Sequence, residues 1–303
     1  MPNPQPGIFA TEGDHHQYLE ARVGENSDLE VLRGGLRRAL EAQESSAERE
    51  GQHLVMGFGN DLWRRLAPNS APEGLRDFQA LEGPHHRAPA TQGDVWFWVH
   101  GPRLDENLAR MLAIWGKLRE DAELQVDERG FRFRDSRDLI GFIDGSANPK
   151  GEKARDAALV PDGLPGAGGS FVLTQRWVHD LPAFHALPLE EQERVVGRSR
   201  ADSIELSGDA MPADSHVSRT DVEEAGVALK VFRRSAPYGH VGEHGLYFLS
   251  FACELRRHQV MLDRMFGIAG DGIYDRIVDF TRPVSGSYYF APSLNDLERA
   301  LGG

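Results

Sequence analysis

Cysteine and long apolar runs are scarce in this sequence. Cys253 is the single cysteine among 303 residues, which excludes a disulfide within the chain. No window approaches the roughly 18 consecutive apolar residues that a membrane-spanning helix needs. Residues 1–7 lack the basic and apolar regions of a secretory signal. We therefore expect a soluble, cytoplasmic protein with no membrane partner.

Basic side chains are also in the minority. The 34 Lys and Arg residues face 47 Asp and Glu residues, which gives a formal net charge of -13. A nucleic-acid partner would need a basic face, so we expect none. Hydrophobic residues make up 40% of the chain, which is enough for a packed core, and the length suits about two ordinary domains.

Two common catalytic signatures are missing. The sequence has no Gly-x-Ser-x-Gly elbow, so a hydrolase triad has no anchor. The glycine-rich segment 163–169 (GLPGAGG) precedes a predicted strand and lacks the Gly-Lys-Ser/Thr ending of a phosphate-binding loop. We interpret it as a flexible connection.

Apolar periodicity divides the chain into two halves that each alternate strands and helices. It predicts strands at 52–59, 94–101, 170–179, 228–233 and 245–253, and helices at 104–118 and 189–196. Between 146 and 169 the composition shifts to Gly, Pro, Lys and Asp, which indicates a domain linker or a long functional loop. We therefore predict an N-terminal domain of residues 1–145 and a C-terminal domain of residues 146–303.

The two halves resemble each other. Residues 94–116 align with residues 245–267 without a gap, and the alignment places Trp96 opposite Tyr247 and Leu104 opposite Leu255. Strands in which apolar and polar residues alternate, rather than strands that are apolar throughout, suit an antiparallel sheet with helices on one face. The sequence predicts an α+β protein made of two duplicated ferredoxin-like domains.

The segment 141–149 (GFIDGSANP) places one carboxylate between two glycines. Glycine permits a sharp bend and a close approach of the backbone to a flat ligand. Asp144 can be the exposed side chain of an ordinary Asp-Gly turn. The apolar neighbours favour a partly buried carboxyl with a raised pKa, which could transfer a proton; they are Leu139, Ile140, Phe142 and Ile143.

The segment 214–220 (DSHVSRT) contains His216, which lies well away from the other histidines in sequence. Most histidines are surface or structural residues, and His216 can be one of them. It offers no His-x-x-x-His spacing that would indicate zinc. An isolated histidine suits haem, because the porphyrin supplies four nitrogens and needs only an axial ligand.

The segment 231–239 (VFRRSAPYG) contains two adjacent arginines at the end of a predicted strand. Neighbouring side chains face opposite sides of a strand, so we expect one of Arg233 and Arg234 to point inward and the other to solvent. An inward guanidinium beside a carboxylate would offer fixed donors to a peroxide oxygen. The alternative is a pair of surface arginines.

Together these segments resemble the dye-decolorising peroxidase family. GFIDGSANP resembles its GxxDG signature, SHVSR its axial-histidine segment and RRSAPYG its distal-arginine segment. PQPGIF, GGSFVLTQRWVHD and DFTRPVSGSYYFAPS are also similar to family segments, so the resemblance covers nearly the whole chain. Its order and spacing match the B-type branch.

The resemblance implies a peroxidase with one haem b per chain in the C-terminal half, held non-covalently. It implies that hydrogen peroxide oxidises small organic reductants, such as dyes and phenolics, by one-electron steps through a ferryl intermediate. Carried over by position, His216 is the proximal iron ligand and Asp144 the distal carboxylate. Arg233 is the distal arginine, and Ser235 is its polar partner.

The resemblance also assigns residues around the haem. Asp279 in IVDFT resembles the acidic residue that accepts a hydrogen bond from the second nitrogen of the proximal histidine. Leu246 and Phe248 share one face of a strand and are candidates for the distal haem wall, or else ordinary core residues. The predicted cofactor-binding set is His216, Arg233, Ile143, Gly145, Asn148, Leu246, Phe248 and Asp279.

Two other functions stay open at this point. One is haem processing in the same pocket, as in a deferrochelatase or porphyrinogen oxidase. The other is a non-catalytic haem carrier, which would need His216 but neither Asp144 nor Arg233. We expect a homo-oligomer, and electrons arriving through Trp or Tyr side chains near the surface. Because residues 293–303 suggest a final helix rather than a docking tail, we expect no packaging in a protein shell.

Overall fold

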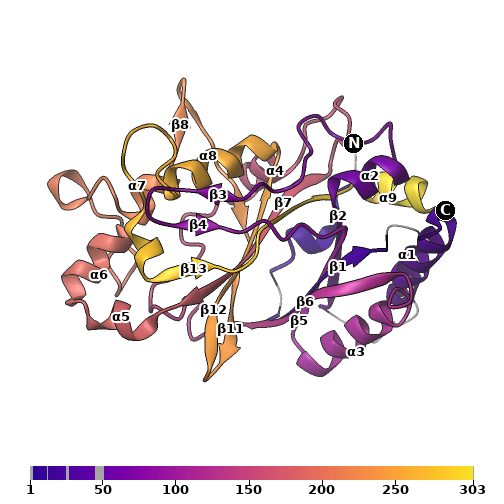
Figure 1. Ribbon diagram of the computed structural model, residues 1–303, viewed down its shortest axis with the longest axis horizontal. Helices are drawn as coiled ribbons and strands as arrows, with labels where there is room; N and C mark the ends of the chain where they lie inside the picture. The colour runs from indigo at the N-terminus through magenta and orange to yellow at the C-terminus, as the bar shows by residue number, and fades with distance from the viewer. Residues whose placement is uncertain (1–2, 12, 25–26, 45–50, 303) are drawn as a thin grey trace.

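The computed structural model describes residues 3–11, 13–24, 27–44 and 51–302. After a short 3₁₀ helix, η1 (Pro6–Ile8), the first half of the chain forms alternating strands and helices (Figure 1). They are β1 (His15–Val23), α1 (Leu29–Glu44), β2 (His53–Phe58), α2 (Asn60–Leu66), β3 (Leu81–Glu82), β4 (Arg87–Ala88), β5 (Val95–Gly101), α3 (Leu104–Trp115) and β6 (Ala122–Phe131).

The second half repeats this alternation with more short elements. Its first part comprises α4 (Glu152–Ala158), β7 (Ser170–His179), α5 (Leu181–Ala186), α6 (Leu189–Val196), η2 (Gly208–Ala210), α7 (His216–Thr220), β8 (Glu223–Glu224) and β9 (Val227–Ala228). Its second part comprises β10 (Phe232–Arg233), β11 (Ala236–His240), β12 (Glu243–Ala252), α8 (Leu255–Met265), η3 (Arg276–Asp279), β13 (Thr281–Pro283), β14 (Ser287–Ala291) and α9 (Leu294–Leu301).

Strand order confirms the predicted duplication. The main strands of the first half lie in the order β6-β1-β5-β2, and those of the second half in the order β14-β7-β12-β11. When the four main strands of each half are numbered in chain order, both sheets have the spatial order 4-1-3-2, which is the ferredoxin-like arrangement. Every pairing between these strands is antiparallel. The aligned segments 94–116 and 245–267 form β5-α3 and β12-α8.

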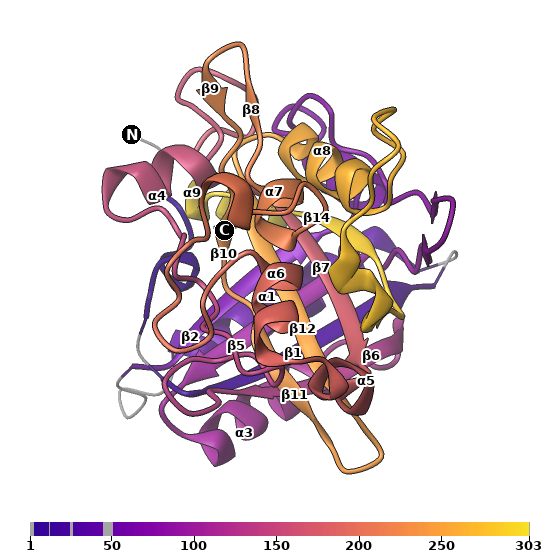
Figure 2. The ribbon, with the colours of Figure 1, turned by 90° about the vertical axis from the view of Figure 1, so that its left-hand side faces the viewer.

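The two sheets join at both edges. Phe58 of β2 pairs with Phe290 of β14, and Gly130 of β6 pairs with Tyr238 of β11. The eight main strands therefore form a closed ring, whose interior is filled by buried aromatic side chains such as Trp98. The outer faces are covered by helices, with α1 and α3 on the first sheet and α7 and α8 over the second (Figures 1 and 2).

Two predicted segments differ from the structure. The strand predicted at 228–233 is two short strands, β9 and β10. The predicted linker 146–169 contains helix α4, because Ala154, Ala157 and Ala158 recur at helical spacing and bury one side of that helix. The domain boundary after residue 145 falls between β6 and β7 and stays a prediction. Among the described residues, no helix is long and apolar enough to cross a membrane.

Candidate functional site

A cavity lies between the outer face of the second sheet and the segments that cover it, including helices α7 and α8. Alternate residues of β7 and β12 point into it, among them Leu246 and Phe248. Most of its wall is apolar; the apolar lining residues are Ile140, Phe142, Ile143, Ala147, Leu173, Trp177, Phe184, Val196, Val217, Val231, Leu246, Phe248, Met261, Leu262, Met265, Ile277 and Phe280. Such a wall suits a large apolar ligand.

The loop that carries Asp144 bends at both of its glycines. Gly141 has φ +98° and Gly145 has φ +76°, a conformation that other residues rarely adopt. The Asp144 amide donates to the Ser136 carbonyl oxygen at 3.0 Å, and the Asp144 Oδ1 accepts from the Gly145 amide at 2.7 Å. Asp144 and Ile143 line the cavity. The loop thus presents a carboxylate with one oxygen already held.

Arg233 enters the same cavity from β10, and Asn148 ties its backbone to the Asp144 loop. The Asn148 Nδ2 donates to the Arg233 carbonyl oxygen at 2.7 Å, and its Oδ1 accepts from the Arg233 amide at 2.9 Å. Neither Asn148 nor Gly145 is among the described residues that line the cavity. Asn148 therefore positions Arg233 without reaching the cavity itself.

The two adjacent arginines do face opposite sides of the chain, but Arg234 does not point to solvent as predicted. Its guanidinium lies over the Trp98 ring, 5.0 Å from the centroid, and donates to the Ile8 carbonyl oxygen at 3.1 Å. Ser235 is absent from the described cavity lining. Its hydroxyl oxygen instead accepts from the Leu249 amide at 3.3 Å, because the short side chain turns toward the neighbouring strand.

His216 is the first residue of α7, and its ring faces the cavity. The Ser215 side chain caps this helix by accepting from the Ser218 amide at 3.3 Å. The His216 Nδ1 lies 2.7 Å from Oδ2 of Asp275, a fully buried carboxylate whose Oδ1 accepts from the Ile277 amide at 3.0 Å. This hydrogen bond favours the neutral tautomer that carries its proton on Nδ1, and in that tautomer Nε2 has the lone pair.

The carboxylate beside His216 is Asp275, not Asp279 as predicted. Asp279 is 36% exposed, and its Oδ1 lies 2.7 Å from the Nε2 of His86. The Tyr274 hydroxyl also donates to Asp279, at 3.2 Å. Asp275 precedes the 3₁₀ helix η3 and Asp279 ends it. Because a 3₁₀ helix has three residues per turn, carboxylates four apart point in different directions.

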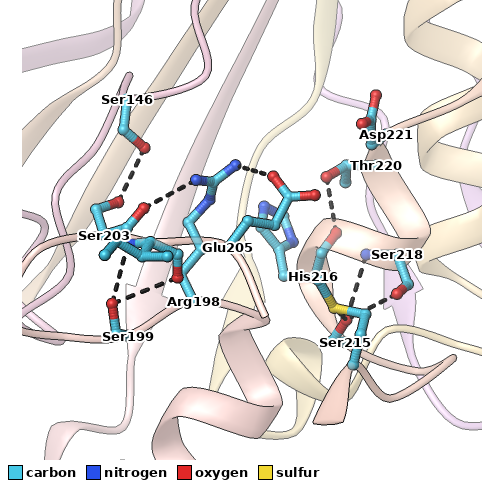
Figure 3. A network of polar contacts seen from close by, with 12 residues as sticks. Ser146, Arg198, Ser199, Ser203, Glu205, Ser215, His216, Ser218, Thr220 and Asp221 are labelled. Atoms are coloured by element: carbon cyan, nitrogen blue, oxygen red, sulfur yellow. Dashed lines mark hydrogen bonds and ion pairs between the residues drawn. The ribbon is translucent and has the colours of Figure 1, made fainter. Parts of the chain in front are cut away.

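Two polar pairs in or beside the cavity wall were not predicted. Arg198 donates to Glu205 at 2.6 Å, and both lie near His216 in Figure 3. In the same view the Ser203 hydroxyl donates to the Ser146 hydroxyl at 3.0 Å. The Ser203–Ser146 contact joins the Asp144 loop to the segment after α6 across 57 residues, which no local pattern indicates.

Two further histidines, the partly buried His179 and the buried His258, also line the cavity. The His179 Nε2 lies 3.1 Å from an oxygen of Asp138, at the start of the Asp144 loop. The His258 Nε2 lies 2.9 Å from the Ser250 hydroxyl. Burial, together with the nearby Arg257 charge, lowers the pKa of His258 to about 3. His258 is therefore a neutral wall residue at ordinary pH.

His216, Asp144 and Arg233 bring an imidazole, a carboxylate and a guanidinium to the wall of one largely apolar cavity. Among the described residues, no group of three or more His, Cys, Asp or Glu side chains could hold a bare metal ion. A single imidazole with a free Nε2 suits a metal that arrives with its other ligands, as in haem. The carboxylate can transfer a proton, and the guanidinium can stabilise an anion.

Comparison with known proteins identifies the family. Residues 5–132 match the N-terminal family model of Dyp-type peroxidases, and residues 135–296 match the C-terminal one. The chain belongs to the Dyp-type peroxidase family.

Individual relatives are similar to this chain over most of its length. A dye-decolorizing peroxidase of Mycobacterium tuberculosis is 36% identical, over 98% of this chain and 90% of that protein. One of Rhodococcus erythropolis is 37% identical, over 82% of this chain and 74% of that protein.

Solved structures agree with the fold throughout. DyPB from Rhodococcus jostii RHA1 has a TM-score of 0.91 and 34% identity, with 97% of each chain covered. A dye-decolorizing protein from V. cholerae has a TM-score of 0.89 and 36% identity, with 97% of this chain and 98% of that chain covered. A DypB variant from R. jostii, solved in complex with heme, has a TM-score of 0.90 and 33% identity, with 97% of each chain covered.

Proposed function

We propose that this protein is a haem b peroxidase that uses hydrogen peroxide to oxidise organic substrates such as dyes and phenolics. The observation that carries the proposal is one cavity lined by an Asp275-bound histidine, an aspartate and an arginine. The similarity of the chain to a DypB variant solved in complex with heme supports haem as the cofactor. Similarity to the DypB structures also supports the B-type branch.

The cavity residues fit a non-covalently bound haem. His216 would hold the iron through Nε2, since Asp275 occupies its Nδ1. Besides Arg233, two cationic side chains of the described cavity lining would be available to bind the propionates: Arg198 and Lys230. When bound, haem would supply the iron at which peroxide is cleaved.

Asp144 and Arg233 act on the peroxide. Because Asp144 Oδ1 accepts from the Gly145 amide, Oδ2 is the oxygen we assign to proton transfer. It accepts the proton of hydrogen peroxide and returns it to the departing oxygen as water forms. The Arg233 guanidinium stabilises the negative charge that develops on the departing oxygen.

The test is peroxide-dependent oxidation of an anthraquinone dye and a phenol by purified protein reconstituted with haem. We expect turnover that requires both haem and peroxide. A parallel incubation with haem but no reductant is analysed for released iron and altered porphyrin. Iron release without dye oxidation would overturn the peroxidase proposal in favour of haem processing, and haem binding without either reaction would indicate a carrier.

Asp275 and Asp279 form a matched pair for mutation. Asp275→Asn replaces the buried carboxylate that accepts a hydrogen bond from His216. The imidazole Nε2 becomes a weaker electron-pair donor to the iron, so we expect haem affinity to fall about 10–100-fold. Asp279→Asn removes an exposed charge that contacts His86 and Tyr274 instead, and should leave affinity unchanged. Haem transfer to excess apomyoglobin measures both. Equal effects of the two changes would contradict this assignment.

A further inference from the structure

A buried carboxyl-phenol cluster lies directly behind the cavity wall. Leu246 and Phe248 of β12 point into the cavity, and Tyr247 between them points into the closed ring of strands, where it is fully buried. The Tyr247 hydroxyl donates to Oε1 of Glu20 at 2.7 Å. The Tyr289 hydroxyl donates to Oε2 of the same carboxyl at 2.8 Å.

Glu20 is an unusual residue for this position. It is 1% exposed, and its side chain lies among the aromatic side chains that fill the interior of the closed sheet. Burying a carboxyl without full compensation costs several kcal/mol or more, as an order of magnitude. Burial accordingly raises the pKa of Glu20, while hydrogen bonds from Tyr247 and Tyr289 oppose that shift. Packing alone would be served as well by an apolar side chain.

A series of aromatic side chains connects Tyr247 on β12 with the opposite side of the closed sheet. The Tyr18 ring stacks on Tyr247 with centroids 3.8 Å apart, and Trp98 lies 6.4 Å from Tyr18. His100 stacks on Trp98 at 4.0 Å, and the partly exposed His53 follows at 5.2 Å. The cluster is therefore linked by successive rings to the protein surface.

We propose that Tyr247 is a redox-active tyrosine whose proton acceptor is Glu20. The inference rests on the proposed peroxidase function, which supplies hydrogen peroxide as the oxidant at the haem. Tyr247 loses one electron toward the oxidised haem and its phenolic proton to the Glu20 carboxylate, leaving a neutral tyrosyl radical and a protonated carboxyl. An electron from an organic reductant, passed along Trp98 and Tyr18, and the proton from Glu20 restore the phenol.

The position of Tyr247 distinguishes it from its neighbours. Tyr289 donates to the same carboxyl, but it lies on β14, and neither Tyr288 nor Phe290 beside it is among the described lining residues. Tyr247 alone of the two is flanked on both sides by residues of the cavity wall. Trp96 also donates to the Tyr247 oxygen, at 3.2 Å, and holds the phenol in place. The relay begins at a buried residue rather than at the surface Trp or Tyr expected from the sequence.

The test is electron paramagnetic resonance of haem-loaded protein mixed with hydrogen peroxide and freeze-quenched. We expect a tyrosyl radical in the parent protein. Tyr247→Phe should lose most of that signal, and Tyr289→Phe should retain it as the matched control. Glu20→Gln should also reduce the signal, because an amide does not take up the phenolic proton. Circular dichroism of each variant confirms that the fold is intact.

Absorption spectra recorded on the same mixtures separate the possible failures. If peroxide changes the haem spectrum and Tyr247→Phe keeps the full tyrosyl signal, the inference is wrong and the peroxidase proposal stands. The same conclusion follows if the parent forms no tyrosyl radical. A full tyrosyl signal in Glu20→Gln would show that Glu20 is not the proton acceptor of Tyr247. If peroxide does not change the haem spectrum at all, the proposed function itself fails.

Discussion

The Arg233→Leu protein should react with hydrogen peroxide about 10²–10³-fold more slowly than the parent, since it loses a fixed donor to the departing oxygen. Leucine keeps much of the bulk of the arginine stem, and Asn148 holds the backbone of residue 233 rather than its side chain, so haem should still bind. Stopped-flow absorption under pseudo-first-order peroxide gives the rate constant.

Arg234 provides the matched control for this measurement. It carries the same charge one residue further along the chain, but its guanidinium lies over Trp98, away from the cavity. Arg234→Leu should lower stability and leave the peroxide rate close to that of the parent. Similar slowing in both variants would mean that general charge or strand distortion, and not a specific contact of Arg233, controls the rate.

The second large effect is expected at Asp144. Asp144→Ala removes the proposed proton acceptor, and positioned acid-base groups contribute about 10²–10⁴-fold to such steps. The glycines on either side keep their positive φ values, so the loop should retain its shape. The same stopped-flow measurement applies, with the exposed Asp162→Ala as control for loss of one negative charge.

A chemical rescue makes the Asp144 prediction more specific. Small bases such as formate or acetate, added to Asp144→Ala, should restore part of the peroxide rate in proportion to their concentration. They should have no effect on Arg233→Leu, where the carboxylate is still present. A parental rate in Asp144→Ala would show that another group takes the proton, and Arg233 would then be the principal contributor.

Much of the fold could be predicted because its signals are local. β7 and α6 occupy the predicted ranges 170–179 and 189–196, and the gapless alignment of two strand-helix units revealed the duplication. Helix α4 was not predicted because glycine and proline dominate the composition around it. Strands β9 and β10 were merged because single-sequence periodicity does not show where pairing stops.

The candidate site could be predicted in part. Asp144, His216 and Arg233 all line one cavity, as the three sequence segments suggested. Asp275 was not predicted, since it contacts His216 across 59 residues and has no motif of its own. Glu20 and Tyr247 meet across 227 residues. The Glu20–Tyr247 contact depends on how the two sheets close into a ring, which neither half of the sequence specifies by itself. His216 and Asp275 both belong to the second half, and they meet through the packing of the segments over its sheet.

The most direct test of this account is a haem titration of the apo-protein followed by absorption and electron paramagnetic resonance. We expect the parent to bind one haem per chain with the spectrum of ferric iron bound to an imidazole. His216→Ala should lose that spectrum and regain it when free imidazole is added. An unchanged iron-ligand spectrum in His216→Ala would contradict the account, because another residue would then hold the iron.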